Sequence, residues 1–259
     1  MKTQVASPSA MLSSYLNDRV FGTEFGREPR WVLALHGWRR TKEDFAGVLG
    51  PGNGSAAIDA VAIDLPGFGA SPAPDEAWGA QQYAEHIGPI LESMSDRVVV
   101  VGHSFGGRVA IELAATHPER VAALVLTGVP VTTPAALRKK PAFSYRLIRR
   151  LRRIGLISER HLERARQRYG SEDYRAATGV MRAVLVRLLA EDYLEALSNV
   201  SCPVDFVWGE LDTVVPLEVA REAIRATKDG HLHVLPGVGH FVPTAAAASL
   251  RDLVVVRRP

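Results

Sequence analysis

The chain has 259 residues, of which 47% are hydrophobic, and a net charge of +3. This length allows one or two domains, and the apolar content is enough for a sizeable core. No apolar run approaches the roughly 20 residues of a membrane-spanning helix, and the N-terminus lacks an apolar signal segment, so we expect neither a secretory signal nor a membrane span. Because Cys202 is the single cysteine, no intrachain disulfide is possible. We therefore expect a cytoplasmic protein in which Cys202 is a small buried apolar residue.

The charge is distributed unevenly along the chain. Between residues 131 and 170, twelve Arg and Lys face two Glu, which gives that segment +10 and leaves −7 for the rest of the chain. This asymmetry says more about partners than the small net charge does.

The first half of the chain alternates between strand-like and helix-like patterns. Short antiparallel edge strands are predicted at residues 11–15 and 19–25, followed by a strand at 30–35. A short helix is predicted at 41–49, with Thr41 as its N-cap and Asp44 in its first turn. In order, the next elements are a strand at 56–63, a Gly- and Pro-rich loop at 66–78 and a helix at 81–94.

Residues 98–101 are four consecutive valines, a run typical of a strand buried on both faces of a parallel sheet. They lead into Gly-x-Ser-x-Gly, centred on Ser104, and then into a predicted helix at 105–116. Strand, Gly-x-Ser-x-Gly and helix form the context of a nucleophile elbow. Such a turn is too tight for side chains at Gly102 and Gly106, strains the Ser104 backbone and directs the helix N-terminus at a developing oxyanion.

After a further strand at 121–127 the alternation stops. Residues 131–200 show no convincing strand but several helical patterns, including an apolar stripe at residues 147, 148, 151 and 154. Ser158 and Ser171 are each suited to begin a helix. The alternation resumes with a strand at 204–208, a helix at 217–226, a strand at 231–235 and a last helix at 245–254. We therefore predict a core formed by residues 1–130 and 201–259, with a helical insertion at 131–200.

Five sequence blocks together resemble the α/β-hydrolase family, in its cap-bearing serine hydrolase and esterase branch. The blocks are His36-Gly37-Trp38, Asp64-Leu65-Pro66-Gly67-Phe68-Gly69-x-Ser71, Gly102-x-Ser104-x-Gly106, Gly209-x-x-Asp212-x-x-x-Pro216 and Gly237-x-Gly239-His240. The resemblance implies an α/β fold, with a mostly parallel central sheet, helices on both of its faces and an inserted helical cap. It also implies a catalytic triad in the order Ser, Asp, His.

The candidate nucleophile is Ser104, although a turn serine without catalytic role is the simpler alternative. Its base must come from eight histidines. His240 differs from the others because it lies in a glycine-rich turn after the last strand, from which a side chain can reach over the carboxyl edge of the sheet. By resemblance, His36 and His103 orient loops.

The candidate acid is Asp212, which matches the family pattern, and Glu210 is its near rival. Asp64 also ends a strand, but in its turn it is expected to bond local backbone N–H groups. For the oxyanion hole, the residue after the nucleophile, Phe105, supplies one backbone N–H, and the resemblance gives the other to Trp38. Both residues are also candidates for substrate binding. The large Trp38 side chain either walls the acyl pocket or only packs the core.

The patterns favour a metal-free serine hydrolase that needs no cofactor and binds no nucleic acid, with an ester or thioester of a small to medium acyl group as substrate. A carbon–carbon hydrolase of an oxo-dienoate, an acyl transferase or perhydrolase, and a triad-retaining small-molecule receptor remain as alternatives, because fold alone does not give function. The basic insertion is either a solvated face or a surface that attracts an anionic substrate, an acidic carrier protein or an anionic membrane.

Overall fold

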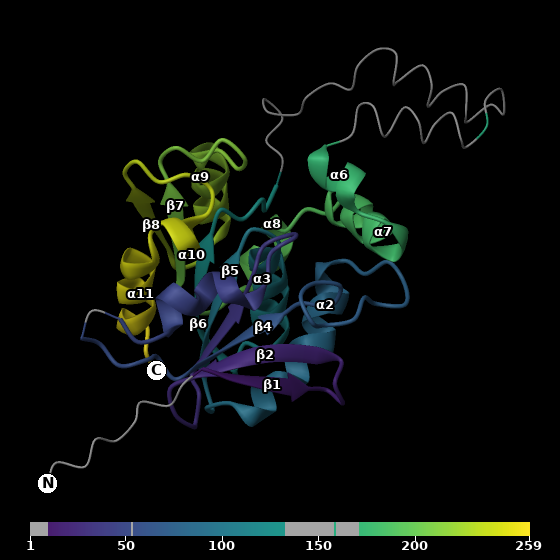
Figure 1. Ribbon diagram of the computed structural model, residues 1–259. Helices are drawn as coiled ribbons and strands as arrows, with labels where there is room; N and C mark the ends of the chain where they lie inside the picture. Colours follow the sequence, from purple (N-terminus) through teal and green to yellow (C-terminus); the bar gives the residue numbers. More distant parts are fainter. Residues whose placement is uncertain (1–9, 53, 133–157, 159–170) are drawn as a thin grey trace, which may run out of the picture.

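The computed structural model of the chain describes residues 10–52, 54–132, 158 and 171–259. Within these residues one eight-stranded sheet has the order β1-β2-β4-β3-β5-β6-β7-β8 (Figure 1). Its strands are β1 (Met11–Tyr15), β2 (Val20–Phe25), β3 (Val32–Leu35), β4 (Ala60–Asp64), β5 (Val98–His103), β6 (Val121–Thr127), β7 (Val204–Gly209) and β8 (Gly230–Leu235). β2 runs antiparallel to both β1 and β4, and all other neighbours are parallel. The predicted mostly parallel sheet, with an antiparallel edge, is confirmed.

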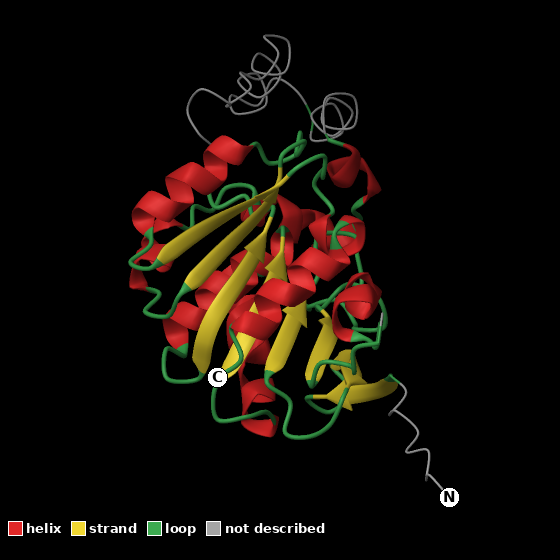
Figure 2. Cartoon of the chain, turned by 90° about the vertical axis from the view of Figure 1, so that its left-hand side faces the viewer, coloured by secondary structure: helices red, strands yellow, loops and turns green. Residues whose placement is uncertain are grey.

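Helices cover both faces of this sheet (Figure 2). Their bounds are η1 (Lys42–Phe45), α1 (Ala46–Leu49), α2 (Ala80–Ile87), η2 (Gly88–Ser93), α3 (Phe105–Thr116), α6 (Glu172–Ala176), α7 (Gly179–Leu188), α8 (Leu194–Asn199), α9 (Leu217–Ala226), α10 (Val242–Ala245) and α11 (Ala247–Val256). Alternate residues of the central strands point to opposite faces, so two apolar clusters form. Val98 and Val100 pack with α2, α3, α8 and α9, whereas Val99 and Val101 pack with α1 and α11. This two-sided burial explains the valine run.

Two predicted helices are interrupted. The helix expected at 81–94 is α2 followed by the 3-10 turn η2, in which Pro89 occupies the first turn. Proline lacks the N–H that an α-helix needs at that point, so the α-helical pattern cannot continue through it. The last helix divides into α10 and α11 at Ala246, whose φ is −137°.

The expected cap of the helix at 41–49 also differs. Thr41 does stand at the N-cap position of η1, but its side chain makes no capping hydrogen bond. The Asp44 carboxylate instead binds the guanidinium of Arg40, at 2.6 and 2.5 Å. Cys202 is buried as predicted, and burial raises the pKa of its thiol to about 11.

Between β6 and β7 the described residues of the insertion form α6, α7 and α8 and contain no strand. Ser171 begins α6 as predicted, because its side chain accepts a hydrogen bond from the Tyr174 N–H. The helix expected around residues 147–154 and the start expected at Ser158 fall on or next to residues that are not described. Arg108 of α3 contacts the insertion, because its guanidinium donates to the carbonyls of Pro130, the residue before it, and of Leu188 in α7. Its guanidinium also lies over the ring of Tyr193, at 5.2 Å.

A buried carboxylate fastens the last strands to the C-terminal segment. Asp205 of β7 is 2% exposed, and it accepts hydrogen bonds from the Arg257 guanidinium at 2.5 and 2.9 Å and binds the His233 ring of β8 at 2.8 Å. Burial favours the neutral acid, but the bonds from Arg257 and His233 outweigh it and lower the pKa of Asp205.

We expect Asp205→Asn to lower the free energy of unfolding by roughly 3 kcal/mol near neutral pH, because Arg257 loses its buried partner. The folded pKa of Asp205 lies below the unfolded value of about 3.9, so the ionised carboxylate stabilises fully above that pH and loses its effect as the pH falls through the folded pKa. The stability difference between the two proteins should therefore shrink below about pH 4, as measured by urea unfolding. Asp229→Asn is the control, since its partner His231 is half exposed. An equal loss in the control would contradict the assignment.

Candidate functional site

Ser104 stands between β5 and α3 with an unusual backbone. Its φ of 50° and ψ of −109° lie outside the regions that L-residues prefer. Its N–H donates to the Thr127 carbonyl of β6, at 2.8 Å, which holds the strained residue at the carboxyl end of the sheet. The elbow that the sequence predicts is therefore present.

The glycines of the elbow allow close packing of backbone on backbone. A Cβ at Gly102 would lie 2.6 Å from the Cα of Gly107, and a Cβ at Gly106 would overlap the Leu35 carbonyl at the end of β3. The Gly106 N–H donates to the His36 carbonyl at 3.0 Å. Only residues without a side chain allow α3 to begin this close to β3, so the elbow and the His36-Gly37-Trp38 segment are fixed against each other.

Asp212 and His240 meet across the ends of β7 and β8. The Nδ1 atom of His240 lies 2.8 Å from Oδ2 of Asp212, whose other oxygen accepts the N–H groups of Val214 and Val215 at 2.9 and 2.8 Å. Both side chains are largely buried, with 8% and 1% exposed for His240 and Asp212. Glu210 is exposed and instead accepts the Gly237 N–H. With Asp212 accepting at Nδ1, Nε2 of His240 is left as the nitrogen able to take a proton.

His240 lies beside the elbow. Its ring centroid is 4.9 Å from that of His103, the residue before Ser104. In the described structure no hydrogen bond joins Ser104 to His240. In ligand-free sites such contacts often lengthen and tighten only when substrate binds.

Gly128, the residue after β6, makes room for the His240 ring. Its φ is +57°, and a Cβ there would lie 2.9 Å from Nδ1 of His240 and 3.3 Å from Oδ2 of Asp212. No sequence motif contains Gly128. Gly128 directly follows a central strand, at the end of the sheet where the other candidate residues lie. That position is the one sequence feature that could have indicated a role for it.

Two further histidines are buried and neutral. His103 binds Thr127 through Nδ1, and burial together with the nearby His240 lowers the pKa of His103 to about 3. His36 contacts the Gly37 carbonyl through Nδ1 and accepts the Leu65 N–H at Nε2, and burial lowers its pKa as well. The bond to Leu65 ties two loops together, in accord with the loop-orienting role expected for His36.

An aromatic cluster surrounds the segment after β3. The Trp38 ring lies 4.9 Å from Phe68 and 5.7 Å from Phe105, both edge to face, and Tyr83 stands 5.0 Å from Phe105. Edge-to-face contact is a favoured arrangement of aromatic rings and contributes roughly 0.5–1.5 kcal/mol per pair beyond the burial of apolar area. Trp38 is partly exposed, so its side chain both packs and contributes surface.

Asp64 holds the neighbouring loop in place. It accepts the Ala70 N–H at 3.0 Å, as predicted, and also binds both the backbone N–H and the ammonium of Lys42, at 2.9 and 2.8 Å. Asp64 is fully buried. The pairing with Lys42 was not predicted, because nothing in the sequence indicates which cation a buried acid will meet.

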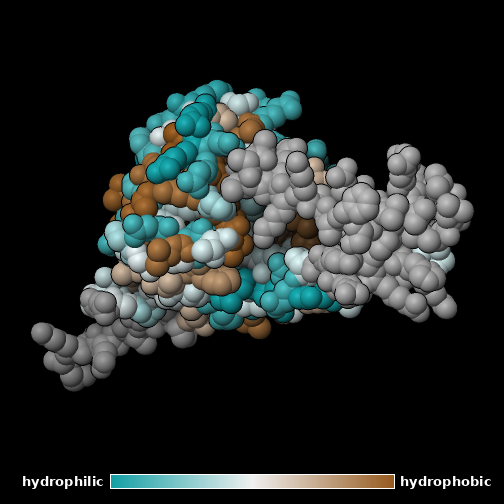
Figure 3. All heavy atoms as spheres, turned by 90° about the horizontal axis from the view of Figure 1, so that it is seen from above, coloured by the Kyte–Doolittle hydropathy of each residue, from teal (hydrophilic) through white to brown (hydrophobic). Residues whose placement is uncertain are grey.

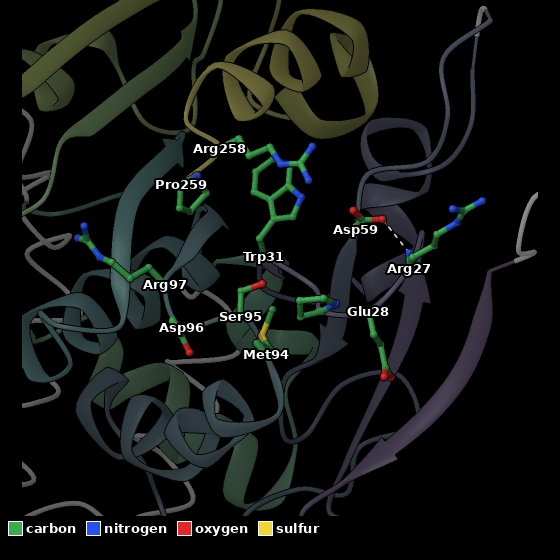
Figure 4. Close-up of a pocket in the computed structure, with 11 residues that line it drawn as sticks. Arg27, Glu28, Trp31, Asp59, Met94, Ser95, Asp96, Arg97, Arg258 and Pro259 are labelled. Atoms are coloured by element: carbon green, nitrogen blue, oxygen red, sulfur yellow. Dashed lines mark hydrogen bonds between the residues drawn. The ribbon is translucent and has the colours of Figure 1, made fainter.

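One further groove in the described chain lies far from Ser104. A groove of about 700 Å³ contains Trp31 with Arg258 above it (Figure 4). Its residues precede β3, β4 and β5 or follow α11, so it lies at the amino end of the sheet, opposite Ser104. Among the described residues, no three His, Cys, Asp or Glu side chains are placed to hold a metal ion, and no helix has the length and apolar character needed to cross a membrane.

We expect Gly128→Ala to reduce turnover at least about tenfold, because the new methyl group displaces the His240 ring from the elbow. Gly237→Ala is the matched control, since Gly237 also has a positive φ, +70°, but has open space around its Cβ position. Both variants carry the same backbone strain. Initial rates of the two variants, with their free energies of unfolding measured in parallel, distinguish the effect of the methyl group on His240 from the effect of backbone strain. Equal rates in the two variants would contradict this role of Gly128.

Comparison with known proteins gives the family of the chain. Residues 32–252 match the model of the alpha/beta hydrolase family. A 2-hydroxy-6-oxononadienedioate/2-hydroxy-6-oxononatrienedioate hydrolase of Cupriavidus pinatubonensis is 25% identical over 92% of this chain and 89% of its own.

Solved structures with similar folds include a thioesterase domain from the curacin biosynthetic pathway, with a TM-score of 0.70, 20% identity and coverage of 96% of this chain and 100% of that one. A thermophilic esterase from Thermogutta terrifontis gives a TM-score of 0.64 at 20% identity, with 93% of each chain covered. The family match covers the strands from β3 to β8 and includes Ser104, Asp212 and His240, and the chain therefore belongs to the alpha/beta hydrolase family and is a hydrolase.

Proposed function

We propose that this hydrolase cleaves an ester or thioester of a small to medium acyl group through the triad Ser104, His240 and Asp212. The observation that carries the proposal is the strained Ser104 at the end of β5, beside a histidine whose Nδ1 is bound to a buried carboxylate. A serine hydroxyl is a weak nucleophile at neutral pH, and a base that is itself held by a third group activates it.

In the proposed mechanism the Oγ of Ser104 attacks the acyl carbonyl while Nε2 of His240 takes its proton. Asp212 accepts the Nδ1–H of His240, which fixes the tautomer and stabilises the imidazolium. The negative oxygen of the tetrahedral intermediate binds the backbone N–H groups of Phe105 and Trp38, at the N-terminus of α3 and after β3. His240 then protonates the leaving alcohol or thiol. Water, deprotonated by the same ring, releases the acid from the acyl-enzyme.

The surroundings of the site favour a largely apolar acyl group. The rings of Trp38, Phe68 and Phe105 stand together beside the proposed oxyanion donors. At the same end of the molecule, the residues Leu211, Val214 and Phe241 are 60%, 65% and 47% exposed. Figure 3 shows hydrophobic residues among hydrophilic ones on this face. Apolar surface around a few polar groups is typical of sites for small organic ligands.

We further propose that residues 131–200 form the cap and select the substrate. Several contacts between described residues of this segment and the core support this proposal. Met181 of α7 packs against Gly67 in the loop after β4, Arg187 donates to the Ala77 carbonyl at 2.8 Å, and Glu191 accepts the Ala80 N–H at the start of α2.

A carbon–carbon hydrolase is the second candidate, and the comparisons favour it specifically. The curated relatives are named for an oxo-nonadienedioate, a dicarboxylate by its name. A dianionic substrate would be attracted by the +10 charge of residues 131–170. The same triad serves both reactions.

Ser104→Ala should remove nearly all turnover and leave the fold intact, because no other group replaces the nucleophile. Serine protease triads lose roughly 10⁶ in rate on such a change. A panel of p-nitrophenyl esters of increasing chain length measures it, together with labelling by a fluorophosphonate. A variant that retained a tenth of the wild-type rate would exclude Ser104.

Asp212→Asn should slow turnover by several orders of magnitude, since the imidazole loses the group that orients it. Glu210→Gln is the matched control, two residues away on the same loop, and should change the rate little. Pre-steady-state kinetics on the best ester compare the two. The opposite order of effects would make Glu210 the acid.

Replacing Arg149, Arg150 and Arg153 together by Glu tests the substrate charge. If the insertion steers an anion, the variant should raise KM for a carboxylate-bearing ester or an oxo-dienedioate and flatten the salt dependence. A neutral ester of the same size should be nearly unaffected. Matched kcat/KM for the charged and neutral substrates in both proteins, at low ionic strength, would show that the arginines form only a solvated face.

A further inference from the structure

We propose that Arg39 is a positioning residue that ties the oxyanion turn to α6 of the insertion. The oxyanion turn is the four-residue turn from Gly37 to Arg40, closed by a hydrogen bond from the Arg40 N–H to the Gly37 carbonyl at 3.1 Å. It contains Trp38, whose N–H is the proposed oxyanion donor, so the inference rests on the proposed function.

Three of the four turn residues are held by contacts with residues outside the insertion. Gly37 packs on the His103 ring, since a Cβ there would lie 2.9 Å from the ring carbon. The Trp38 ring packs edge to face on its aromatic neighbours. Arg40 binds Asp44 through two hydrogen bonds and lies 5.0 Å above the Phe241 ring.

The remaining residue, Arg39, is strained and points away from the core. Its φ is +57°, in the left-handed region that residues with a Cβ avoid. Its guanidinium Nη1 lies 3.1 Å from Glu172 and 3.4 Å from Asp173, both in the first turn of α6. Two carboxylates on one guanidinium therefore hold the strained residue from outside the core.

The other end of this tether is itself fixed. Ser171 caps α6 through the Tyr174 N–H, and α6 contacts α7, which rests on Gly67 through Met181. The chain of contacts runs from the oxyanion turn to the insertion and returns to the loop after β4. Without it, Arg39 is free to relax toward a negative φ, which moves the peptide that carries the Trp38 N–H. The tether therefore links the seating of the insertion to the alignment of an oxyanion donor.

The test compares variants that remove the tether with one that also removes the strain. Arg39→Ala and the double variant Glu172→Gln/Asp173→Asn both break the ion pairs, so each should lower kcat about three- to fivefold with KM changed less than about twofold. Arg39→Gly also lacks the tether, but glycine accepts a positive φ. It should return kcat to within about twofold of wild type. Arg221→Ala, which breaks an exposed Arg221–Glu218 pair on α9, is the matched control and should not alter kcat.

Two readouts separate the tether from a general structural effect. Salt should lower the wild-type kcat toward that of Arg39→Ala and leave the variant unchanged, because exposed ion pairs are screened. Exchange of the Arg40 amide, which closes the turn, should quicken in Arg39→Ala and in the double variant but not in Arg221→Ala.

The proposal would be overturned if Arg39→Ala and the double variant both kept the kcat and the amide exchange rate of the wild-type protein. Equal impairment of Arg39→Gly and Arg39→Ala would also overturn it, because the guanidinium would then act on substrate and not through the turn. Failure of the proposed function is distinguishable, since a wild-type protein that neither hydrolyses esters nor reacts with a fluorophosphonate still reports the tether through amide exchange.

Discussion

The start of α3 rests directly on the backbone at the end of β3, and the site depends on this contact. It exists because Gly106 has no side chain to hold the two segments apart, and the bond from Gly106 to the His36 carbonyl fixes their spacing. The contact sets Ser104 on its strained backbone and brings the residues after β3 alongside it. Strain of this kind persists only where the surroundings determine it completely, and here buried strands on both sides do so.

Burial keeps two histidines near the elbow neutral. His36 and His103 lie in fully buried positions where each ring is held by backbone groups, so both stay neutral and act as rigid spacers between loops. His240 lies 4.9 Å from His103 but has a carboxylate at Nδ1. A second cation beside an imidazolium would oppose the proposed proton transfer, and the lowered pKa of His103 prevents it.

Two arginines of the core contact the insertion, and one of them is buried while the other is exposed. Arg108 reaches it from within the buried face of α3 and satisfies two carbonyls, whereas Arg39 reaches it from a solvent-exposed turn. The buried contact contributes to stability because an unpaired guanidinium there is unfavourable. The exposed one contributes little to stability and instead bears on how the turn is held. Together they connect α7 with the elbow helix α3 and α6 with the proposed oxyanion turn.

The order of elements, the elbow and the family could be predicted from the sequence, because each depends on patterns within short stretches of residues. Four valines in a row require a strand with two apolar faces, and Gly102 and Gly106 around Ser104 require a turn without side chains. Asp212 was predicted from the family spacing, and His240 from its place in a glycine-rich turn after the last strand. The structure adds the hydrogen bond between them, which the sequence alone does not contain.

Contacts between residues distant in the chain were decided only by the tertiary structure. The sequence placed Asp44 as part of a helix start, and even its pairing with Arg40, only four residues earlier, depends on how the folded turn directs the two side chains. It marked Asp64 as a turn residue, but folding paired it with Lys42, 22 positions earlier. The roles of Gly128 and Arg39 could not be predicted for the same reason, because they depend on contacts with His240 and with α6, which lie far along the chain. Local patterns determine which segments become strands, helices and tight turns, because those depend on side-chain period and backbone freedom. Which charges pair, and which glycine makes room for a ring, depends on how the sheet aligns its strand ends, and only the folded chain decides that.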